Sequence, residues 1–323
     1  MTSSPGTGGH DHDSAADTAG VTRSGGSFTR SLPGQMIAEM RPKQWVKNVL
    51  VFIAPAGAGT LLHASVLPKA IIAFLAFSLT ASGLYIVNDI RDVASDRAHP
   101  RKRFRPIAAG TIPLRVAWIA AAVFVLGGIA LGTLATTWQF GVTLVAYACI
   151  TVAYSLALKT QPVIELACVA SGFVLRATGG GAATNTRLSV WFLVVISFGA
   201  LFIVTGKRLA EMPDADGKGG ERRVVLNEYT KSFLEGTLLV TAAVSITGYC
   251  LWAFDRTGLT SRAHGSLFWI QLTVVPVVIG ILYMLRLLDA GEGGTPEDLV
   301  YHDRTLQALG VIWAALMLIG LYG

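Results

Sequence analysis

The stretch LPKAIIAFLAFSLTASGLYIVNDIRDVASD, residues 67–96, joins a long apolar run directly to a cluster of acids. A run of about 20 apolar residues is what a helix needs to cross the hydrocarbon core of a bilayer. The whole chain has the same character, because 52% of its 323 residues are hydrophobic and its mean hydropathy is +0.55. This composition argues against an ordinary soluble domain and predicts a membrane protein.

Nine apolar runs are long enough to span a membrane. They cover residues 44–62, 67–88, 113–134, 137–157, 162–182, 188–207, 234–254, 267–288 and 304–322. Together they fill most of residues 36–323 and leave no room for a second folded domain, so we expect one all-α, polytopic membrane domain. Residues 1–35 are rich in Gly, Ser, Thr and Asp, which predicts a disordered N-terminal tail.

Lys and Arg are distributed unevenly over the two sides of this arrangement. Of those in or beside the predicted loops, 19 fall on the side of the N-terminus and 4 on the opposite side. Because cytoplasmic loops collect positive charge, we expect a multi-pass protein of the plasma membrane with its N-terminus in the cytoplasm. The two long polar loops, after the second and sixth spans, then lie on the cytoplasmic side, where we expect the active site.

Three aspartates follow the second predicted span: Asp89, Asp92 and Asp96, spaced i, i+3 and i+7. On a helix this spacing places all three carboxylates on one face. Like charges repel there unless they share a cation, and oxygen ligands with open positions suit Mg²⁺ bound to substrate phosphates. We therefore predict a Mg²⁺ site at these aspartates, with Asn88 beside them. The alternative is a solvated helix end in which the acids pair with neighbouring arginines.

The basic stretch RAHPRKRFRP, residues 97–106, comes directly after these acids. Such a stretch is often a topology determinant or a contact to anionic lipid headgroups. Next to a Mg²⁺ site, however, Arg and Lys are well suited to hold the remaining oxygens of a diphosphate. The combination of acids and cations favours a pyrophosphorylated substrate.

The pattern NDxxDxxxD after the second of nine spans, with a second polar loop after the sixth, resembles the UbiA superfamily of intramembrane prenyltransferases. The resemblance extends over nearly all of residues 36–323. It implies a ring of membrane helices around a central cavity that opens sideways to lipid and is capped on the cytoplasmic side.

The second polar loop departs from the common pattern of that family, in which a second aspartate-rich motif binds a second Mg²⁺. The matching place reads GKRLAE, residues 206–211. Together with RPKQWVKN at 41–48 and NDIRDVASDRAHPRKRFRPIAAG at 88–110, it resembles the family's branch of phosphoribosyltransferases that act on decaprenyl phosphate. That resemblance implies transfer of 5-phosphoribose from PRPP to a polyprenyl phosphate, with release of pyrophosphate. The lipid product would be a precursor for cell-wall arabinan.

With this resemblance, the polar residues receive roles. The catalytic set would be Asp89, Asp92 and Asp96 as the Mg²⁺ ligands, with Lys207, Arg208 and Glu211. The substrate-binding set would be Lys43, Lys47, Asn48, Asn88, Arg101, Arg105, Tyr154, Lys159 and Arg176. Lys207 and Arg208 would hold either the ribose 5-phosphate or the lipid phosphate, and the sequence does not decide between the two. Glu211 either binds sugar hydroxyls or pairs with Arg208.

Arg176 is the charge that lies deepest within a predicted span, which makes it a functional candidate, with an internal pair to Glu165 or to backbone carbonyls as the alternative. The nucleophile would be an oxygen of the lipid phosphate, which is anionic at neutral pH and needs no histidine base. The expected partners are PRPP, a polyprenyl phosphate and membrane lipids, with no nucleic acid. The oligomeric state, a homo-oligomer included, stays open.

Two other functions stay open as well. A Mg²⁺-dependent prenyltransferase that moves a polyprenyl group to an aromatic acceptor would need a second acidic motif, which GKRLAE does not supply. An ion-coupled transporter would need ionisable residues near the middle of several spans and internal repeat symmetry, neither of which the sequence offers.

Overall fold

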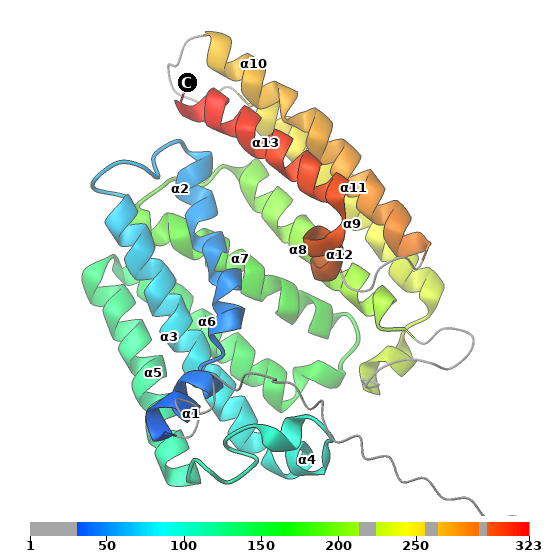
Figure 1. Cartoon of the computed structure of the whole chain (residues 1–323). Helices are drawn as coiled ribbons and strands as arrows, with labels where there is room; N and C mark the ends of the chain where they lie inside the picture. The colour runs from blue at the N-terminus through cyan, green and yellow to red at the C-terminus, as the bar shows by residue number, and fades with distance from the viewer. Residues whose placement is uncertain (1–30, 213–223, 256–263, 291–295, 323) are drawn as a thin grey trace, which may run out of the picture.

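The structure is a computed structural model that describes residues 31–212, 224–255, 264–290 and 296–322. Every regular element in these ranges is a helix (Figure 1). In chain order they are α1 Leu32–Glu39, η2 Pro42–Phe52, α2 Ile53–Gly57, α3 Leu67–Arg91, α4 Val93–Ala98, η3 Lys102–Phe104, α5 Leu114–Ala135, α6 Trp138–Leu156, η4 Leu158–Thr160, α7 Ile164–Thr184, α8 Val190–Ala210, η5 Val224–Glu228, α9 Lys231–Phe254, α10 His264–Leu272, α11 Val274–Asp289, α12 Pro296–His302 and α13 Arg304–Tyr322. The predicted tail falls mostly outside the described residues, and α1 reaches into its last part.

Eight segments of the described residues are long and apolar enough to cross a membrane. They are α3, α5, α6, α7, α8, α9, α13 and Leu267–Asp289, which combines most of α10 with α11. Each corresponds to a predicted span. The first predicted span, 44–62, is built differently, from the 3₁₀ helix η2 and the short helix α2. Pro55 lies inside α2 and has no N–H to continue a hydrogen-bond ladder, which favours a broken segment.

The long helices form an incomplete ring (Figure 1). Successive helices pack on each other from α3 through α5, α6, α7 and α8 to α9, and α11 and α13 continue the series. The broken segment η2 and α2 lies inside the ring, packed on α3 and α7. Its apolar side chains line cavities together with side chains of α8 and α13. The fold therefore contains apolar cavities between the η2–α2 segment and α13.

Close helix packing explains several glycines. A Cβ at Gly180 of α7 would collide with the carbonyl oxygen of Val51 in η2. A Cβ at Gly83 of α3 would come within 2.7 Å of the Ala121 carbonyl oxygen of α5, which is also too close. Small residues let helices approach in this way inside a membrane, where tight packing replaces the hydrophobic driving force.

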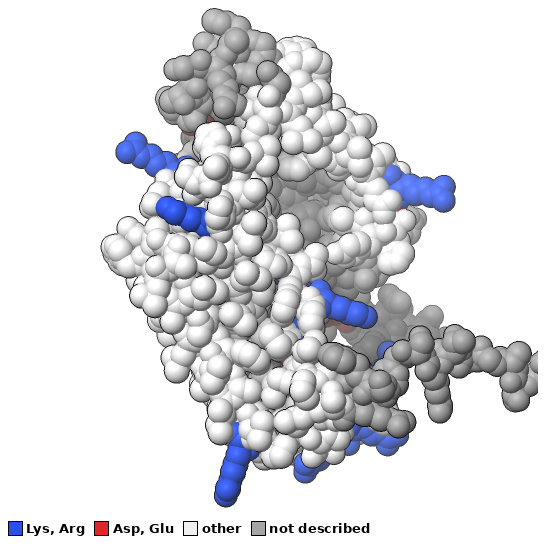
Figure 2. All heavy atoms as spheres, turned by 60° about the vertical axis from the view of Figure 1, so that its left-hand side comes forward, with Lys and Arg blue, Asp and Glu red and all other residues white. Residues whose placement is uncertain are grey.

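Charge is placed at the margins of this fold or buried within it. The face seen in Figure 2 is uncharged over most of its area, and Lys and Arg project mainly near its borders. The described residues also include six buried charged side chains: Glu39, Asp89, Asp96, Glu165, Arg176 and Arg208. A buried charge is costly unless it is paired and hydrogen-bonded. The partners of these six residues define the candidate site.

Candidate active site

The helix that was predicted to carry all three aspartates is interrupted at Asp92. Helix α3 ends at Arg91, α4 begins at Val93, and Asp92 between them has φ −87° and ψ 6°. The prediction of one continuous helix through the three aspartates is therefore wrong, and their shared face stays a prediction. Asp89 and Asp96 lie close together, and the carboxylate of Asp92 accepts a hydrogen bond from the Asn88 side chain at 2.9 Å.

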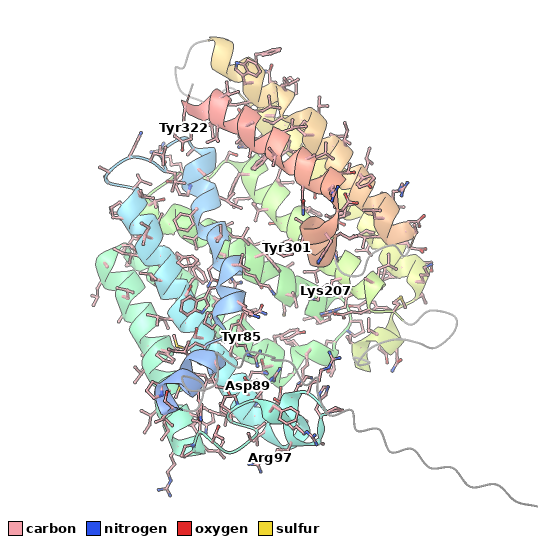
Figure 3. All side chains as sticks on the ribbon, in the orientation of Figure 1. Tyr85, Asp89, Arg97, Lys207, Tyr301 and Tyr322 are labelled. Atoms are coloured by element: carbon pink, nitrogen blue, oxygen red, sulfur yellow. The ribbon has the colours of Figure 1, made fainter. Side chains whose placement is uncertain are left out.

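Asp89 and Asp96 are buried and share one arginine. Nη1 of Arg105 donates to Asp89 at 3.0 Å and to Asp96 at 2.7 Å. Nη2 of Arg41 contacts both oxygens of Asp89, at 2.6 and 2.5 Å. We call these four residues the acid–arginine cluster. Its two acids and two arginines balance in charge, which permits burial of the carboxylates at this end of α3 (Figure 3).

Arg41 was not predicted as a site residue. It adopts a left-handed backbone, with φ 52° and ψ 60°, between α1 and η2. This conformation is uncommon outside glycine, and such strain is often found at functional sites. The guanidinium also lies 5.3 Å from the centre of the Tyr85 ring, so that Arg41 is fixed from two sides.

Glu39 is a second residue that the sequence did not indicate. Its buried carboxylate accepts a hydrogen bond from the backbone N–H of Ile107 at 2.9 Å and lies beside Asp89. Burial raises the pKa of Glu39 to about 7, because the Asp89 carboxylate adds to this effect and the Ile107 N–H only partly opposes it. Glu39 thereby joins α1 to the segment that follows the basic stretch.

Other predicted residues surround this cluster without entering it. Lys43 and Arg101 are exposed, Lys47 is half-buried, and the Arg101 backbone N–H donates to the His99 ring. Arg97, which was not singled out, donates from its Nε to the Ala108 carbonyl at 3.0 Å. The basic stretch therefore combines one half-buried cation that contacts the acids, Arg105, with cations that are more exposed.

A separate network surrounds Arg176 in α7. Its Nε donates to Asn48 at 2.7 Å, and its two other nitrogens donate to the Tyr147 hydroxyl and the Gly172 carbonyl. Asn48 in turn donates to Ser78 at 3.0 Å. Arg176 therefore connects α7 with η2 and α6 and, through Asn48, with α3. The structure brings the predicted pair Asn48 and Arg176 together, and the guanidinium is held by neutral groups.

The GKRLAE segment forms a third group, at the end of α8. Arg208 donates to both oxygens of Glu165, at 2.7 and 2.8 Å, and to Glu211 at 2.7 Å. The alternative partner suggested for Arg176, Glu165, therefore belongs to Arg208. Glu211 pairs with Arg208, one of the two options left open by the sequence. Lys207 is half-buried in the last turn of α8 (Figure 3).

Tyr229, which follows the second polar loop, contacts the turn at the start of α7. The Tyr229 hydroxyl accepts a hydrogen bond from the Val163 N–H at 2.7 Å. Val163 has φ 64°, which is strained for a β-branched residue. Burial raises the pKa of Tyr229. This contact fixes the turn before Glu165, whose carboxylate binds Arg208. Tyr154, near the end of α6, also lies close enough to Arg208 to interact with it electrostatically. Lys159 is exposed in η4.

Two of the carboxylates at the α3 end lie close together. In the described part of the chain, no three His, Cys, Asp or Glu residues are arranged to hold a metal ion. Asp89 and Asp96, however, lie close enough to share one nitrogen of Arg105. Mg²⁺ usually takes one or two carboxylates and completes its shell with waters and substrate phosphates. Asp89 and Asp96 are two carboxylates of this kind, and a Mg²⁺ site here, with Asp92 as a third ligand, stays a prediction.

Comparison with known proteins identifies the family. Residues 49–318 match the sequence model of the UbiA prenyltransferase family. The chain belongs to this family. Its apolar helices and its UbiA membership make it a multi-pass membrane protein.

Curated UbiA relatives match almost end to end. A Mycobacterium tuberculosis protein named decaprenyl-phosphate phosphoribosyltransferase is 41% identical over 88% of this chain and 93% of its own length. A Corynebacterium glutamicum protein of the same name is 40% identical over 91% of this chain and 88% of its own.

Solved UbiA structures share the fold. A homologue from Archaeoglobus fulgidus, bound to DMAPP and Mg²⁺, superposes with a TM-score of 0.65 at 18% identity, over 88% of this chain and 97% of that chain. The all-α, UbiA-type architecture predicted from the sequence is thereby confirmed.

Proposed function

We propose that this protein transfers 5-phosphoribose from PRPP to a polyprenyl phosphate, releasing pyrophosphate. The relatives that match nearly the whole chain are named for this transfer to decaprenyl phosphate, which we take as the lipid here. The product would be decaprenylphosphoryl-5-phosphoribose, which would supply cell-wall arabinan.

The observation that carries the proposal is the arrangement of Arg208. In an ordinary prenyltransferase of this family, the second polar loop would supply acids for a second Mg²⁺. Here Glu165 and Glu211 both bind the guanidinium of Arg208, which occupies their carboxylates and offsets one of their two negative charges. A site with one acid pair that can bind metal, and with cations elsewhere, suits two phosphate-bearing substrates better than a prenyl diphosphate and an aromatic ring.

The acid–arginine cluster would bind the diphosphate of PRPP. Asp89 and Asp96, with Asp92 as the predicted third ligand, would hold Mg²⁺, which supplies positive charge against the departing diphosphate when it is bound. Arg41 and Arg105 already lie on these carboxylates and are partly exposed, so they are placed to bind phosphate oxygens. Lys43, Lys47 and Arg101 would hold further oxygens from the rim.

The transfer itself exchanges one bond at ribose C1. The bond from C1 to the diphosphate oxygen breaks, its electron pair leaves with pyrophosphate, and an oxygen of the lipid phosphate bonds to C1. That oxygen is anionic at neutral pH and needs no base. Lys207, Tyr154, Lys159 and the Arg176 network with Asn48 would orient the phosphates of the two substrates.

The proposal includes an orientation in the membrane. With 19 of the Lys and Arg in or beside the predicted loops on one side and 4 on the other, the N-terminus, the tail 1–35 and the acid–arginine cluster would face the cytoplasm. PRPP is a soluble, highly charged compound, so it would reach the site from that side, whereas the lipid would enter from the bilayer.

The test is pyrophosphate release by the detergent-purified full-length protein. We expect release from PRPP only when Mg²⁺ and decaprenyl phosphate are both present, with a lipid product whose mass equals the lipid phosphate plus ribose 5-phosphate less one water. No release from PRPP, together with release from a polyprenyl diphosphate given an aromatic acceptor, would return the protein to the ordinary prenyltransferases.

A further inference from the structure

Two apolar cavities lie in a row between the broken segment η2–α2 and the helices α8 and α13. The first, of about 500 Å³, is lined among others by Leu50, Phe173, Met284 and Leu306. The second, of about 410 Å³, is lined among others by Ile53, Phe192, Trp252 and Leu321. Both cavities share three lining residues: Val195, Ile196 and Trp313. The cavities are therefore neighbours, with the Trp313 side chain at their boundary.

The first cavity begins beside the Arg176 network. Leu50 follows Asn48 by two residues in η2, and Phe173 precedes Arg176 by one turn of α7, so the cavity wall adjoins the Arg176 network. Two labelled tyrosines mark the positions of the cavities in Figure 3. Tyr322, the last residue of α13, lines the second cavity, and Tyr301 directly follows Val300, which lines the first. At about 1.5 Å per residue, Leu306 to Trp313 spans about 10 Å and Trp313 to Leu321 about 12 Å.

The Trp313 ring is held in place by a chain of hydrogen bonds. Its Nε1 donates to the Tyr249 hydroxyl at 2.8 Å, and Tyr249 bonds to Thr273 at 2.7 Å. The Thr273 hydroxyl also lies 2.5 Å from the Ile270 carbonyl, where α10 gives way to α11. Tyr249 and Thr273 are buried, whereas Trp313 is 37% exposed, so a buried partner holds the indole N–H while part of the ring stays accessible. The ring is thus fixed at the boundary.

We propose that Trp313 determines how strongly the enzyme prefers long polyprenyl tails, an inference that rests on the proposed function. The first isoprene units of the lipid occupy the first cavity, next to the Arg176 network. A tail long enough to reach the second cavity must pass along the fixed indole and makes apolar contact with its large ring. A short tail ends before it reaches the indole. Aromatic side chains supply unusually large contact areas of this kind.

The test compares long and short lipid phosphates on wild type and Trp313→Ala. Pyrophosphate release from PRPP is measured with decaprenyl phosphate and with farnesyl phosphate. We expect the substitution to raise the KM for decaprenyl phosphate at least tenfold and to leave kcat, the KM for farnesyl phosphate and the KM for PRPP within twofold. Tyr249→Phe, which keeps the ring but removes its hydrogen-bond partner, should give a smaller rise.

The matched control is Trp118→Ala. Trp118 is half-exposed and lines a separate apolar groove between α3, α5 and α6, so its removal should change neither lipid's KM. An unchanged ratio of the two KM values in Trp313→Ala, whether both rise or neither does, overturns the inference.

The inference can also fail separately from the proposed function. If wild type does not use PRPP, the same lipids are compared by native mass spectrometry of the full-length protein. Retention of decaprenyl phosphate that falls at least tenfold in Trp313→Ala, with no change for farnesyl phosphate, would support the inference. Equal retention in both proteins would overturn it.

Discussion

The two arginine–carboxylate groups of this protein differ in how much of them reaches solvent. In the acid–arginine cluster, the side chains of Arg41 and Arg105 are 27% and 30% exposed, although Asp89 beneath them is only 1% exposed. In the second group, Arg208 is 2% exposed and Glu165 is 0% exposed. The first group has cations that can exchange carboxylates for a phosphate. In the second, the Arg208–Glu165 pair is enclosed and only Glu211 is partly exposed, and we assign this group to holding α7 and α8 together.

This difference separates a binding role from a structural one. An enclosed pair is strongly destabilised when one partner is removed, because the other charge stays buried and uncompensated. A partly exposed arginine can be rehydrated, so its loss affects stability less and binding of a phosphate more. The four predictions that follow use this contrast, from the largest expected effect to the smallest.

Asp89→Asn should have the largest effect on activity. It removes a predicted Mg²⁺ ligand and one carboxylate that holds both Arg41 and Arg105. We expect pyrophosphate release to fall by about 100- to 1000-fold, as when a group that stabilises developing charge is lost. The control is Asp289→Asn at the exposed end of α11, which should leave release unchanged. Near-normal release by Asp89→Asn would contradict the assignment.

Glu165→Gln should have the largest effect on stability. It leaves the buried Arg208 with one charged partner instead of two and should lower the free energy of unfolding by about 3 kcal/mol. Thermal unfolding in detergent measures this change. Glu235→Gln breaks the exposed pair with Lys231 and should cost about 0–1 kcal/mol. Equal shifts in the two variants would refute the structural role.

Arg105→Lys should change PRPP binding with little change in stability. A lysine keeps the charge but cannot form the paired contacts of a guanidinium to phosphate or to two carboxylates. We expect the KM for PRPP to rise by about tenfold, which corresponds to about 1.4 kcal/mol. The melting temperature should stay close to that of wild type. A fall in melting temperature as large as that of Glu165→Gln, with the KM for PRPP unchanged, would reverse the roles of the two groups.

Tyr229→Phe should have the smallest effect of the four. It removes the hydroxyl that accepts the Val163 N–H and should cost about 1 kcal/mol of stability. We expect kcat to change less than twofold, since Arg208 and its acids stay in place. Tyr301→Phe, at an exposed position, is the control for thermal unfolding and should show no shift. A tenfold loss of kcat would instead place Tyr229 in the reaction.

The sequence predicted the elements whose signal is local. An apolar run that spans a bilayer is visible in one window of the chain, and eight of the nine predicted spans correspond to segments of the structure. The first run, 44–62, was expected as one span but is broken at η2 and α2. The reason is not apparent from hydropathy, because it depends on Pro55 and on the close approach to Gly180.

The site was predictable only in part, because its pairs join distant segments. The acids were found from their spacing, but Arg41 lies 48 residues from its partner Asp89, and Glu165 lies 43 residues from Arg208. Glu39 carries no signal in the sequence beyond being a lone acid in a mainly apolar helix. The helix break at Asp92 also could not be seen, since no Gly or Pro marks it.

The central claim is that, when PRPP binds, its phosphates replace the aspartates as partners of Arg41 and Arg105. The contacts of Arg208 to its glutamates stay unchanged. A structure of the full-length protein with PRPP and Mg²⁺ tests it most directly. The account predicts that Arg41 and Arg105 move from Asp89 and Asp96 to phosphate oxygens, while Arg208 keeps both contacts to Glu165. A structure in which Arg105 stays on the aspartates and the diphosphate of PRPP binds Arg208 would contradict it.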